Sequence, residues 1–326
     1  MPEGARPGAR QSRERMFVLL AFASIWLVWG STFLAIRYAI AGIPPVLMCG
    51  LRLLSAGLAL VVWARASGNP WPRGVEWRNA ALVGLLLPGI GNVSVTIGVA
   101  HVHSGLVALL VSTIPLWMAL LASWGPRAEP PGRQAIAGLG LGFAGIALLI
   151  GPGLLSGHDA TLSPYWALVP VAGSLSWAWG SLWSRRARLP GSPLMSTGFG
   201  LLVAGAGSLL VALARGEFAR WDALATPASA WAALAYLASF GSVLGFSAYL
   251  YLLRHRPPAV VATYAFVNPI VAMFIGYLFG GETLTPRTLA AAAVVLAAVL
   301  LITTAAPARR REGITSGVGA LPARRA

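Results

Sequence analysis

The chain has 326 residues, of which 57% are hydrophobic and only 10% are charged. A soluble globular domain carries roughly 25% charged residues, so this composition excludes an ordinary soluble fold and predicts a chain solvated by lipid. The formal net charge is +15, and all 24 basic residues are arginines. The single cysteine, Cys49, excludes an internal disulfide or a multi-cysteine metal site.

Ten apolar segments each approach the roughly 20 residues that a helix needs to cross the hydrocarbon core. These predicted spans cover residues 16–36, 44–64, 79–100, 104–124, 134–151, 164–184, 193–214, 229–253, 257–279 and 288–305. We therefore expect an all-α integral membrane protein with ten transmembrane helices. The basic segments 1–15 and 306–326 are expected to be unfolded tails.

The arginines indicate how these spans are oriented. If the N-terminus is cytoplasmic and the spans alternate, nineteen arginines fall on the cytoplasmic side and four on the outer side, while Arg52 lies inside a span. Cytoplasmic loops of membrane proteins carry such an excess of basic residues. This distribution favours a membrane role for the basic charge over nucleic-acid binding, and it predicts two cytoplasmic termini.

The sequence also contains a weak internal repeat. Aligning His101 with His255 aligns Pro115 with Pro269, and the tripeptide at 29–31 recurs at 179–181. Each repeat, 16–152 and 164–305, contains five predicted spans, so the second enters the membrane inverted. Inverted repeats are typical of alternating-access transporters, which bind substrate near the midplane between the two halves.

Three stretches resemble a known family. They are W-L-V-W-G-S-T at 26–32, R-L-L-S-A at 52–56, and a C-terminal set with A-Y at 248–249, R-P-P-A at 256–259, N-P at 268–269 and G-E-T-L-T at 281–285. With these features the chain resembles the EamA-type carriers of the drug/metabolite transporter superfamily. The resemblance implies two five-helix halves around a central cavity, location in a bacterial-type inner (plasma) membrane and export of a small solute.

Arg52 is the clearest candidate for contact with a solute. It lies about 12 Å from the outer end of its predicted span at 1.5 Å per residue, and no Asp or Glu lies in any predicted span. A charge at this depth is costly and usually functional. The guanidinium either binds a substrate carboxylate or phosphate or is satisfied by backbone carbonyls or the outer interface.

Amides and prolines interrupt other apolar spans. Pro269 and Pro115 each remove a backbone donor and predict kinks. Each kink either lines or gates a cavity or only shapes the bundle. Asn268 is expected to face protein or water rather than lipid, as an interhelical hydrogen bond or a substrate contact. Asn92 follows a Pro- and Gly-rich stretch at 88–91 and is expected to face inward.

Aromatic side chains recur at matching places in the two halves. The candidates for a cavity wall are Trp26, Trp29, Trp177, Trp179, Tyr249 and Tyr264. Together with Arg52, Asn92, Pro115, Asn268 and Pro269 they form the predicted substrate cavity. Anchoring at the membrane interface is the alternative for the tryptophans and tyrosines.

Glu282 follows the ninth predicted span and precedes the tenth. Acidic residues are favoured near helix N-termini, so Glu282 is expected to fix the loop, with a gate or ion-coupling role as the alternative. The motif G-x-x-x-G at 138–142 predicts close helix packing, either within the chain or in a homodimer.

These observations favour a secondary transporter of a small organic metabolite, with an amino-acid-like or other carboxylate-bearing solute fitting Arg52. Efflux of a neutral or hydrophobic drug is the alternative substrate reading, and a non-transporting scaffold or receptor is an alternative of another class. An enzyme is not expected, because the spans lack converging acid, base or nucleophilic groups. The expected partners are a small-molecule solute and membrane lipid, with no nucleic acid, cofactor or metal.

Overall fold

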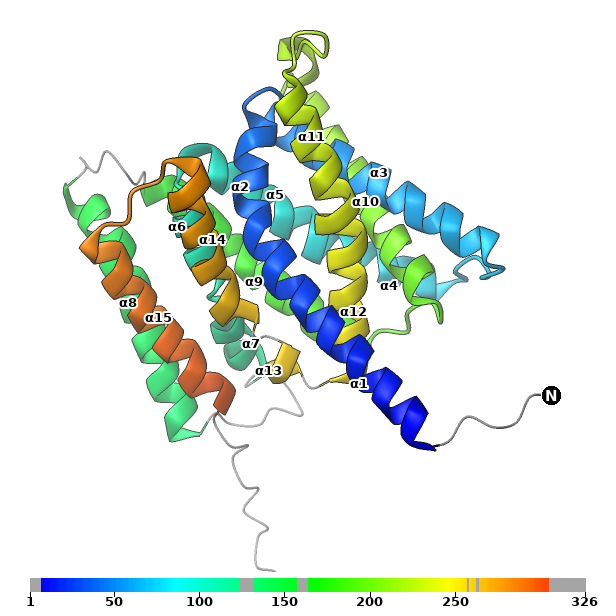
Figure 1. Ribbon diagram of the computed structural model, residues 1–326, viewed down its shortest axis with the longest axis horizontal. Coiled ribbons are helices and arrows are strands. Elements are labelled where there is room, and N and C mark those ends of the chain that lie inside the picture. The colour runs from blue at the N-terminus through cyan, green and yellow to red at the C-terminus, as the bar shows by residue number, and fades with distance from the viewer. Residues whose placement is uncertain (1–6, 123–131, 157–163, 257, 262–263, 305–326) are drawn as a thin grey trace, which may run out of the picture.

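The structure is a computed structural model that describes residues 7–122, 132–156, 164–256, 258–261 and 264–304. All regular structure in these ranges is helical, as Figure 1 shows. Six helical segments of the described chain are long and apolar enough to cross a membrane. They are Arg15–Ile40, Pro45–Ala66, Val75–His101, Ser104–Leu121, Pro193–Ala214 and Ala228–His255.

Over the residues that the structure describes, every predicted span coincides mainly with helical structure. In the first half the elements are α1 (Pro7–Ala23), η1 (Ser24–Val28), α2 (Trp29–Ile40), α3 (Pro45–Ala66), α4 (Val75–Gly84), η2 (Leu85–Gly91), α5 (Asn92–His101), α6 (Ser104–Val111), α7 (Ile114–Ala122) and α8 (Arg133–Ser156). In the second half they are α9 (Pro164–Arg186), α10 (Pro193–Ala214), η3 (Phe218–Arg220), α11 (Ala228–Tyr236), η4 (Leu237–Leu244), α12 (Gly245–His255), α13 (Pro258–Val261), α14 (Tyr264–Gly280) and α15 (Pro286–Thr304).

The expectation of an unfolded N-terminal tail is wrong for part of its length. Helix α1 begins at Pro7, so residues 7–15 are helical although they precede the apolar run. Proline is favoured in the first turn of a helix, and the Ala, Arg, Gln and Glu that follow are strong helix formers. The tail at 306–326 lies outside the described residues.

Three of the spans are not continuous α-helices. The segments η1, η2 and η4 are π-helical, and each joins two α-helices within one span. In η2, Pro88 has no backbone N–H to donate, which disfavours the regular α-helical ladder at that point. Short π segments occur frequently at functional sites, and all three lie near the cavity described below.

The span at 104–124 is also interrupted. Helix α6 ends at Val111, Ser112 and Thr113 form a turn, and α7 begins at Ile114. The predicted interruption at Pro115 therefore exists, but the break precedes the proline, which is the second residue of α7. Helix α14, in contrast, runs through Pro269 without a break in its helical assignment.

Helices α3 and α10 form an antiparallel pair with very close backbones (Figure 1). A Cβ atom added to Gly57 would lie 2.6 Å from the Leu202 backbone nitrogen, and one added to Gly50 would lie 2.6 Å from the Leu209 side chain. Gly198 and Gly205 of α10 meet Val61 and Leu54 of α3 in the same way. Two glycines on each helix therefore build one seam, and a side chain at any of the four would force the helices apart.

Helices α8 and α15 form a second antiparallel pair, at the left of Figure 1. Gly138 packs against Leu301 and Ile302 of α15, and Gly142 packs against Leu116 of α7. Both glycines of the G-x-x-x-G motif are thus used inside the chain. This packing removes the reason to expect a homodimer through that motif.

Candidate functional site

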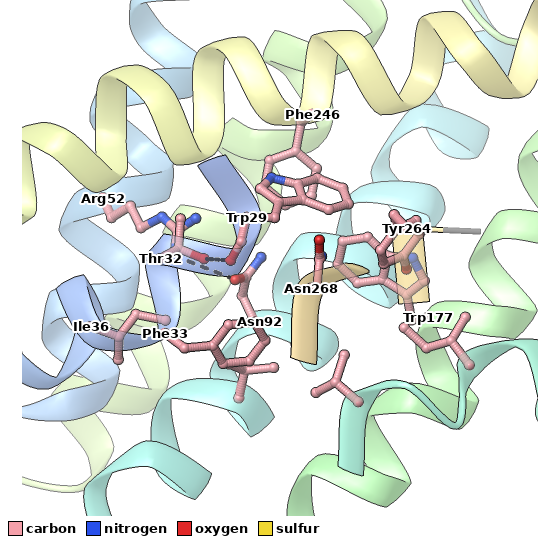
Figure 2. Close-up of a pocket in the computed structure, with 13 residues that line it drawn as sticks. Trp29, Thr32, Phe33, Ile36, Arg52, Asn92, Trp177, Phe246, Tyr264 and Asn268 are labelled. Carbon is pink, nitrogen blue, oxygen red and sulfur yellow. Dashed lines mark hydrogen bonds between the residues drawn. The ribbon is translucent and has the colours of Figure 1, made fainter. Parts of the chain in front are cut away.

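A cavity of about 60 Å³ lies between the two halves of the chain. Its wall consists of Trp29, Thr32, Phe33, Ile36, Arg52, Asn92, Val95, Val111, Ile114, Trp177, Phe246, Tyr264 and Asn268. Figure 2 shows Arg52 and Asn92 on one side of this space, Tyr264 and Trp177 on the other, and Asn268 between them. The wall is therefore mainly apolar and aromatic, with one guanidinium and two amides.

Arg52 is almost completely buried, with 2% of its surface exposed. Its Nε donates to Ser242 Oγ at 2.8 Å, and its Nη1 donates to Asn92 Oδ1 at 3.5 Å. Gly241 lies close to Arg52 Nη2, and its lack of a side chain leaves room for that atom. A Cβ at Gly241 would lie 3.0 Å from Nη2. No carboxylate accepts a hydrogen bond from Arg52 in the described structure, so its positive charge is held by neutral groups only.

The polar groups of the wall depend on the π-helical segments. Ser242, which accepts from Arg52, lies in η4, and Asn92 follows η2 directly. The side-chain amide of Asn268, in the orientation that satisfies its hydrogen bonds, donates to the carbonyl oxygens of Ile25 and Trp26 at 3.0 Å each. Those carbonyls belong to η1. Asn268 therefore ties the second half to an irregular segment of the first half.

Trp29 lies at the centre of an aromatic cluster. Its ring centroid lies 5.3–5.6 Å from those of Trp177, Phe246, Tyr249 and Tyr264. Its indole nitrogen donates to the Gly241 carbonyl oxygen at 3.0 Å. Aromatic pairs at such separations contribute about 0.5–1.5 kcal/mol each beyond area burial, so the indole position is strongly fixed.

Six predicted cavity residues line the cavity: Trp29, Arg52, Asn92, Trp177, Tyr264 and Asn268. Tyr249 lies behind this wall, where its hydroxyl accepts from Trp177 Nε1 at 3.1 Å and bonds Ser181 Oγ at 2.8 Å. Trp26 packs on Phe22 with centroids 5.4 Å apart. Pro115 and Pro269 are buried next to lining residues without lining the cavity themselves.

Trp179 was wrongly expected in the cavity wall, because its side chain is 58% exposed on the surface of the bundle. Two residues apart on an α-helix differ by about 200° in direction at 3.6 residues per turn. Trp177 and Trp179 of α9 therefore cannot both face the cavity. The internal repeat aligns Trp179 with Trp29, but the buried ring that contacts Trp29 is Trp177.

The sequence did not identify several residues of the cavity wall, among them Phe246, Thr32 and Ile36. It also did not identify Ser242 as the hydrogen-bond acceptor of Arg52. The apolar residues gave no distinguishing signal within apolar spans. The available signal for Ser242 was the small-residue pattern Gly241-Ser242 with Gly245 one turn later. A Cβ at Gly245 would collide with the Trp29 indole, so this glycine marks where the two helices approach each other.

Glu282 holds three helices together at one end of the bundle. Its Oε1 accepts from the Ser104 backbone nitrogen at 2.9 Å, from Ser104 Oγ at 2.5 Å and from Arg37 Nη1 at 3.0 Å. Its Oε2 accepts from the Gly105 backbone nitrogen at 3.1 Å. The carboxylate thus satisfies the free N–H groups that begin α6, which lies beside α14 (Figure 1).

The pKa of Glu282, which lies between α14 and α15, is below its ordinary value of 4.5. Burial alone raises the pKa, because it disfavours the charged form. The hydrogen bonds from Ser104 and Gly105, with the nearby His103, outweigh burial and give a net lowering. Glu282 is therefore ionised at neutral pH and acts as a hydrogen-bond acceptor.

A second Gly-Glu pair, not identified from the sequence, uses the same geometry. Glu217 Oε2 accepts from the Leu47 backbone nitrogen, near the start of α3, at 2.8 Å. Gly216 and Gly281 both have positive φ, of 68° and 61°, which turns the chain back toward the bundle before each glutamate. The described residues contain no group of three His, Cys, Asp or Glu side chains that could hold a metal ion.

Comparison with known proteins agrees with this architecture. A solved crystal structure covers 89% of this chain and 97% of its own with a TM-score of 0.59 at 20% sequence identity, which indicates a shared fold. The Escherichia coli protein named uncharacterized inner membrane transporter YedA is 36% identical over 268 residues, covering 81% of this chain and 83% of its own. The Bacillus subtilis protein named uncharacterized transporter YvbV is 27% identical over 278 residues, covering 85% and 88%.

The family model named EamA-like transporter family matches the chain twice, at residues 16–151 and 164–304. The two matched segments contain all the wall residues of the cavity. They also contain Glu282 and its partners. The chain belongs to the EamA-like transporter family of membrane proteins.

Proposed function

We propose that the protein is a secondary transporter that exports a small organic metabolite carrying a carboxylate, using alternating access around the central cavity. Family membership supports membrane transport in general rather than catalysis. The class of solute, the direction of transport and the mechanism are proposals. Export follows the resemblance to the drug/metabolite carriers, and the cytoplasmic placement of both termini follows the arginine distribution.

The observation that carries the choice of solute is the isolated charge of Arg52. Burying an ion without an opposite charge costs several kcal/mol, and among the described side chains a hydroxyl and an amide oxygen accept from the guanidinium. The four carboxylates whose side chains the structure describes lie elsewhere: Glu217 and Glu282 bind helix starts, and Glu76 and Asp222 bind backbone N–H groups near helix ends. A solute carboxylate would supply the missing charge through paired N–H donors.

The aromatic cluster supports an organic solute rather than an inorganic anion. Trp29, Trp177, Phe246 and Tyr264 line most of one side of the cavity. Rings of this kind give apolar contact area, and a few polar groups then fix the orientation of the ligand. An amino-acid-like solute would place its carboxylate at Arg52 and Asn92 and its side chain against these rings.

Paired features of the two halves support an inverted repeat. The family model matches each half once. The segments η2 and η4 occupy corresponding spans of the two halves, and the glycine seam pairs α3 of one half with the corresponding helix α10 of the other, running antiparallel. Alternating access in such proteins is largely a rocking of one repeat against the other around a fixed site.

The small volume of the cavity indicates that the two halves must move apart before a solute can bind. At about 60 Å³ it is far smaller than the roughly 300–1,000 Å³ typical of formed ligand pockets. A solute therefore needs the halves to separate. In the expected orientation the Glu282 contacts close the outer end, and the rings of Tyr249 and Tyr264 lie toward the cytoplasmic end.

The test is metabolite profiling of culture medium from strains that express the wild type, Arg52→Gln, Arg133→Gln or an empty vector, at matched membrane levels. Arg133→Gln removes the same charge from the exposed start of α8 and serves as the control. A carboxylate-bearing solute enriched by the wild type and the control, but not by Arg52→Gln, would support the proposal. Equal enrichment with Arg52→Gln would exclude Arg52 as the solute contact.

A neutral or hydrophobic drug is the second candidate, favoured by the aromatic wall. The same strains distinguish the two, because efflux of a neutral compound would need the rings and not the charge. Trp177→Ala would then reduce drug tolerance while Arg52→Gln would leave it unchanged. Loss of transport with Arg52→Gln alone would favour the carboxylate.

A further inference from the structure

A second pocket lies outside the central cavity, at the opposite end of the bundle from Glu282. It has a volume of about 370 Å³ and lies between the last turn of α9, the connection at 187–191 and the end of α12. The arginine distribution predicts that this end faces the cytoplasm. The proposed transport mechanism gives this pocket no role.

Two arginines from different helices line the pocket. Arg254 of α12 is fixed by the α9–α10 connection: its Nη1 donates to the Gly191 carbonyl oxygen and its Nη2 to the Pro190 carbonyl oxygen, each at 3.2 Å. Arg185 lies in the last turn of α9 with its side chain exposed. A guanidinium has five N–H donors, so Arg254 keeps donors after these two bonds.

The pocket has positive charge and no internal counter-charge. None of its nine lining residues is acidic. Arg186 at the end of α9 and Arg188 in the connection are both exposed nearby, so the local field favours an anion. An anion here would accept from Arg185 and from the remaining donors of Arg254, and it would bridge α9 and α12.

The apolar part of the lining indicates what kind of anion fits. Leu189, Leu250 and Leu253 also line the pocket. Trp183, which directly precedes the lining residue Ser184, exposes 38% of its surface, and tryptophan is enriched at the membrane interface. A basic pocket between membrane-spanning helices that continues into apolar surface suits a phosphate with hydrocarbon chains attached.

We propose that this pocket binds the headgroup phosphate of an anionic phospholipid, with Arg185 and Arg254 as its ligands. The glycerol backbone and the start of the acyl chains would then lie against the three leucines. The bound lipid would hold together the ends of α9 and α12, the two helices that also share the Trp177–Tyr249 and Ser181–Tyr249 hydrogen bonds.

The experiment measures binding of phosphatidylglycerol to the purified, delipidated full-length protein by native mass spectrometry, with thermal stability as a second readout. Phosphatidylcholine tests the need for net negative charge, and inorganic phosphate tests whether the acyl chains matter. Arg185→Gln is the main variant, because Arg254 also anchors the connection. Arg133→Gln is the charge-matched control outside the pocket.

We expect phosphatidylglycerol to bind and to raise the melting temperature more than phosphatidylcholine does. One arginine near a membrane surface contributes about 1 kcal/mol, so Arg185→Gln should weaken phosphatidylglycerol binding about five-fold and Arg133→Gln should leave it unchanged. Equal binding of the two lipids would overturn the proposal, as would equal loss in both variants. Stabilisation by inorganic phosphate alone, equal to that by the lipid, would replace the lipid with a free anion.

Discussion

Removal of the Glu282 carboxylate should destabilise the protein more than removal of any other described carboxylate except Glu217. The side chain is buried, with 5% exposure, and it accepts four hydrogen bonds. In Glu282→Ala the backbone N–H groups of Ser104 and Gly105 lose their acceptor, as does the Ser104 hydroxyl. The first turn of α6 would then begin in the bundle with unsatisfied donors.

The expected magnitude follows from these groups. A buried donor left without its acceptor costs about 1–3 kcal/mol. The ion pair with Arg37 adds little, because 43% of the Arg37 side chain is exposed and solvent-screened pairs contribute at most about 1 kcal/mol. Allowing for water at the opened site, we expect Glu282→Ala to lower the free energy of unfolding by about 2–5 kcal/mol. Glu282→Gln keeps one acceptor oxygen and should lose about half as much.

Unfolding can be followed through the accessibility of a single buried thiol. Cys49 is the single cysteine and is buried, so a thiol-reactive fluorescent dye reports unfolding of the purified protein in detergent. Glu76→Ala is the matched control, because Glu76 accepts one exposed bond, from the Arg73 backbone nitrogen at 3.2 Å. The reasoning is refuted if Glu282→Ala unfolds at the same temperature as Glu76→Ala.

The lowered pKa of Glu282 gives the same prediction a pH dependence. A group whose pKa is lower in the folded state contributes stability above its unfolded pKa, and that stability is lost as pH falls through the folded pKa. Stability of the wild type should therefore fall on acidification below the ordinary value of 4.5. The difference in melting temperature between the wild type and Glu282→Gln should narrow over the same range, and a constant difference would contradict a carboxylate role.

Three further substitutions, and a fourth that serves as a control, test the cavity. Gly245→Ala drives a methyl group into the Trp29 indole, so we expect lower thermal stability and loss of transport; unchanged melting would show that the helices can separate freely. Asn268→Ala removes two hydrogen bonds to the π-helical segment of the first span and should cost about 1–3 kcal/mol in the dye assay, whereas no change would exclude the assigned amide orientation. Trp177→Ala should lower the free energy of unfolding by about 3–5 kcal/mol, because it leaves a cavity in the aromatic cluster. Trp179→Ala, at a side chain that is 58% exposed, should lower it by under about 1 kcal/mol. Equal losses would contradict the placement of Trp177 inside the bundle and of Trp179 on its surface.

Polar residues in apolar spans were the most predictable part of the site. Arg52, Asn92 and Asn268 stand out in the sequence, because lipid offers such groups no hydrogen bonds. All three line the cavity. The sequence could not predict their hydrogen-bond partners. Ser242 is one of many serines in the spans, and Ile25 and Trp26 contribute backbone carbonyls, which every residue has.

Helix faces were less predictable, for a geometric reason. A π-helical segment inserts extra backbone into the α-helical repeat, so residues beyond it no longer follow the spacing that a regular helix predicts. Trp26 and Trp29 are three residues apart and would share a face in an α-helix. Trp26 lies within η1 and Trp29 directly follows it, and in the structure Trp29 enters the aromatic cluster while Trp26 packs on Phe22.

The structural role of Glu217 could have been predicted from the sequence. Gly216-Glu217 follows a predicted span, as Gly281-Glu282 does, and a glycine before a glutamate allows the chain to turn back with positive φ. The family resemblance includes Gly281-Glu282 and does not include Gly216-Glu217. The structural role of both is the same, because each carboxylate accepts from backbone N–H groups in the first turn of a helix in the other half.

The two halves are joined by close helix packing and by a hydrogen-bonded carboxylate. Along α3 and α10, glycines bring the backbones together, since a Cβ added to Gly57 or Gly205 would lie within 2.6 Å of a backbone nitrogen of the opposite helix. At the Glu282 end, α14 also packs directly on α2 and α6, because Gly30 meets Val271 and Gly105 meets Met273 in addition to the hydrogen bonds of the carboxylate. Under the proposed alternating access, separating α14 from α2 and α6 would therefore disrupt apolar packing as well as the Glu282 hydrogen bonds. A Cβ added to Gly241 would lie 3.0 Å from both Arg52 Nη2 and the Thr32 methyl, so α2, α3 and η4 meet at the charge that the proposed carboxylate solute would neutralise.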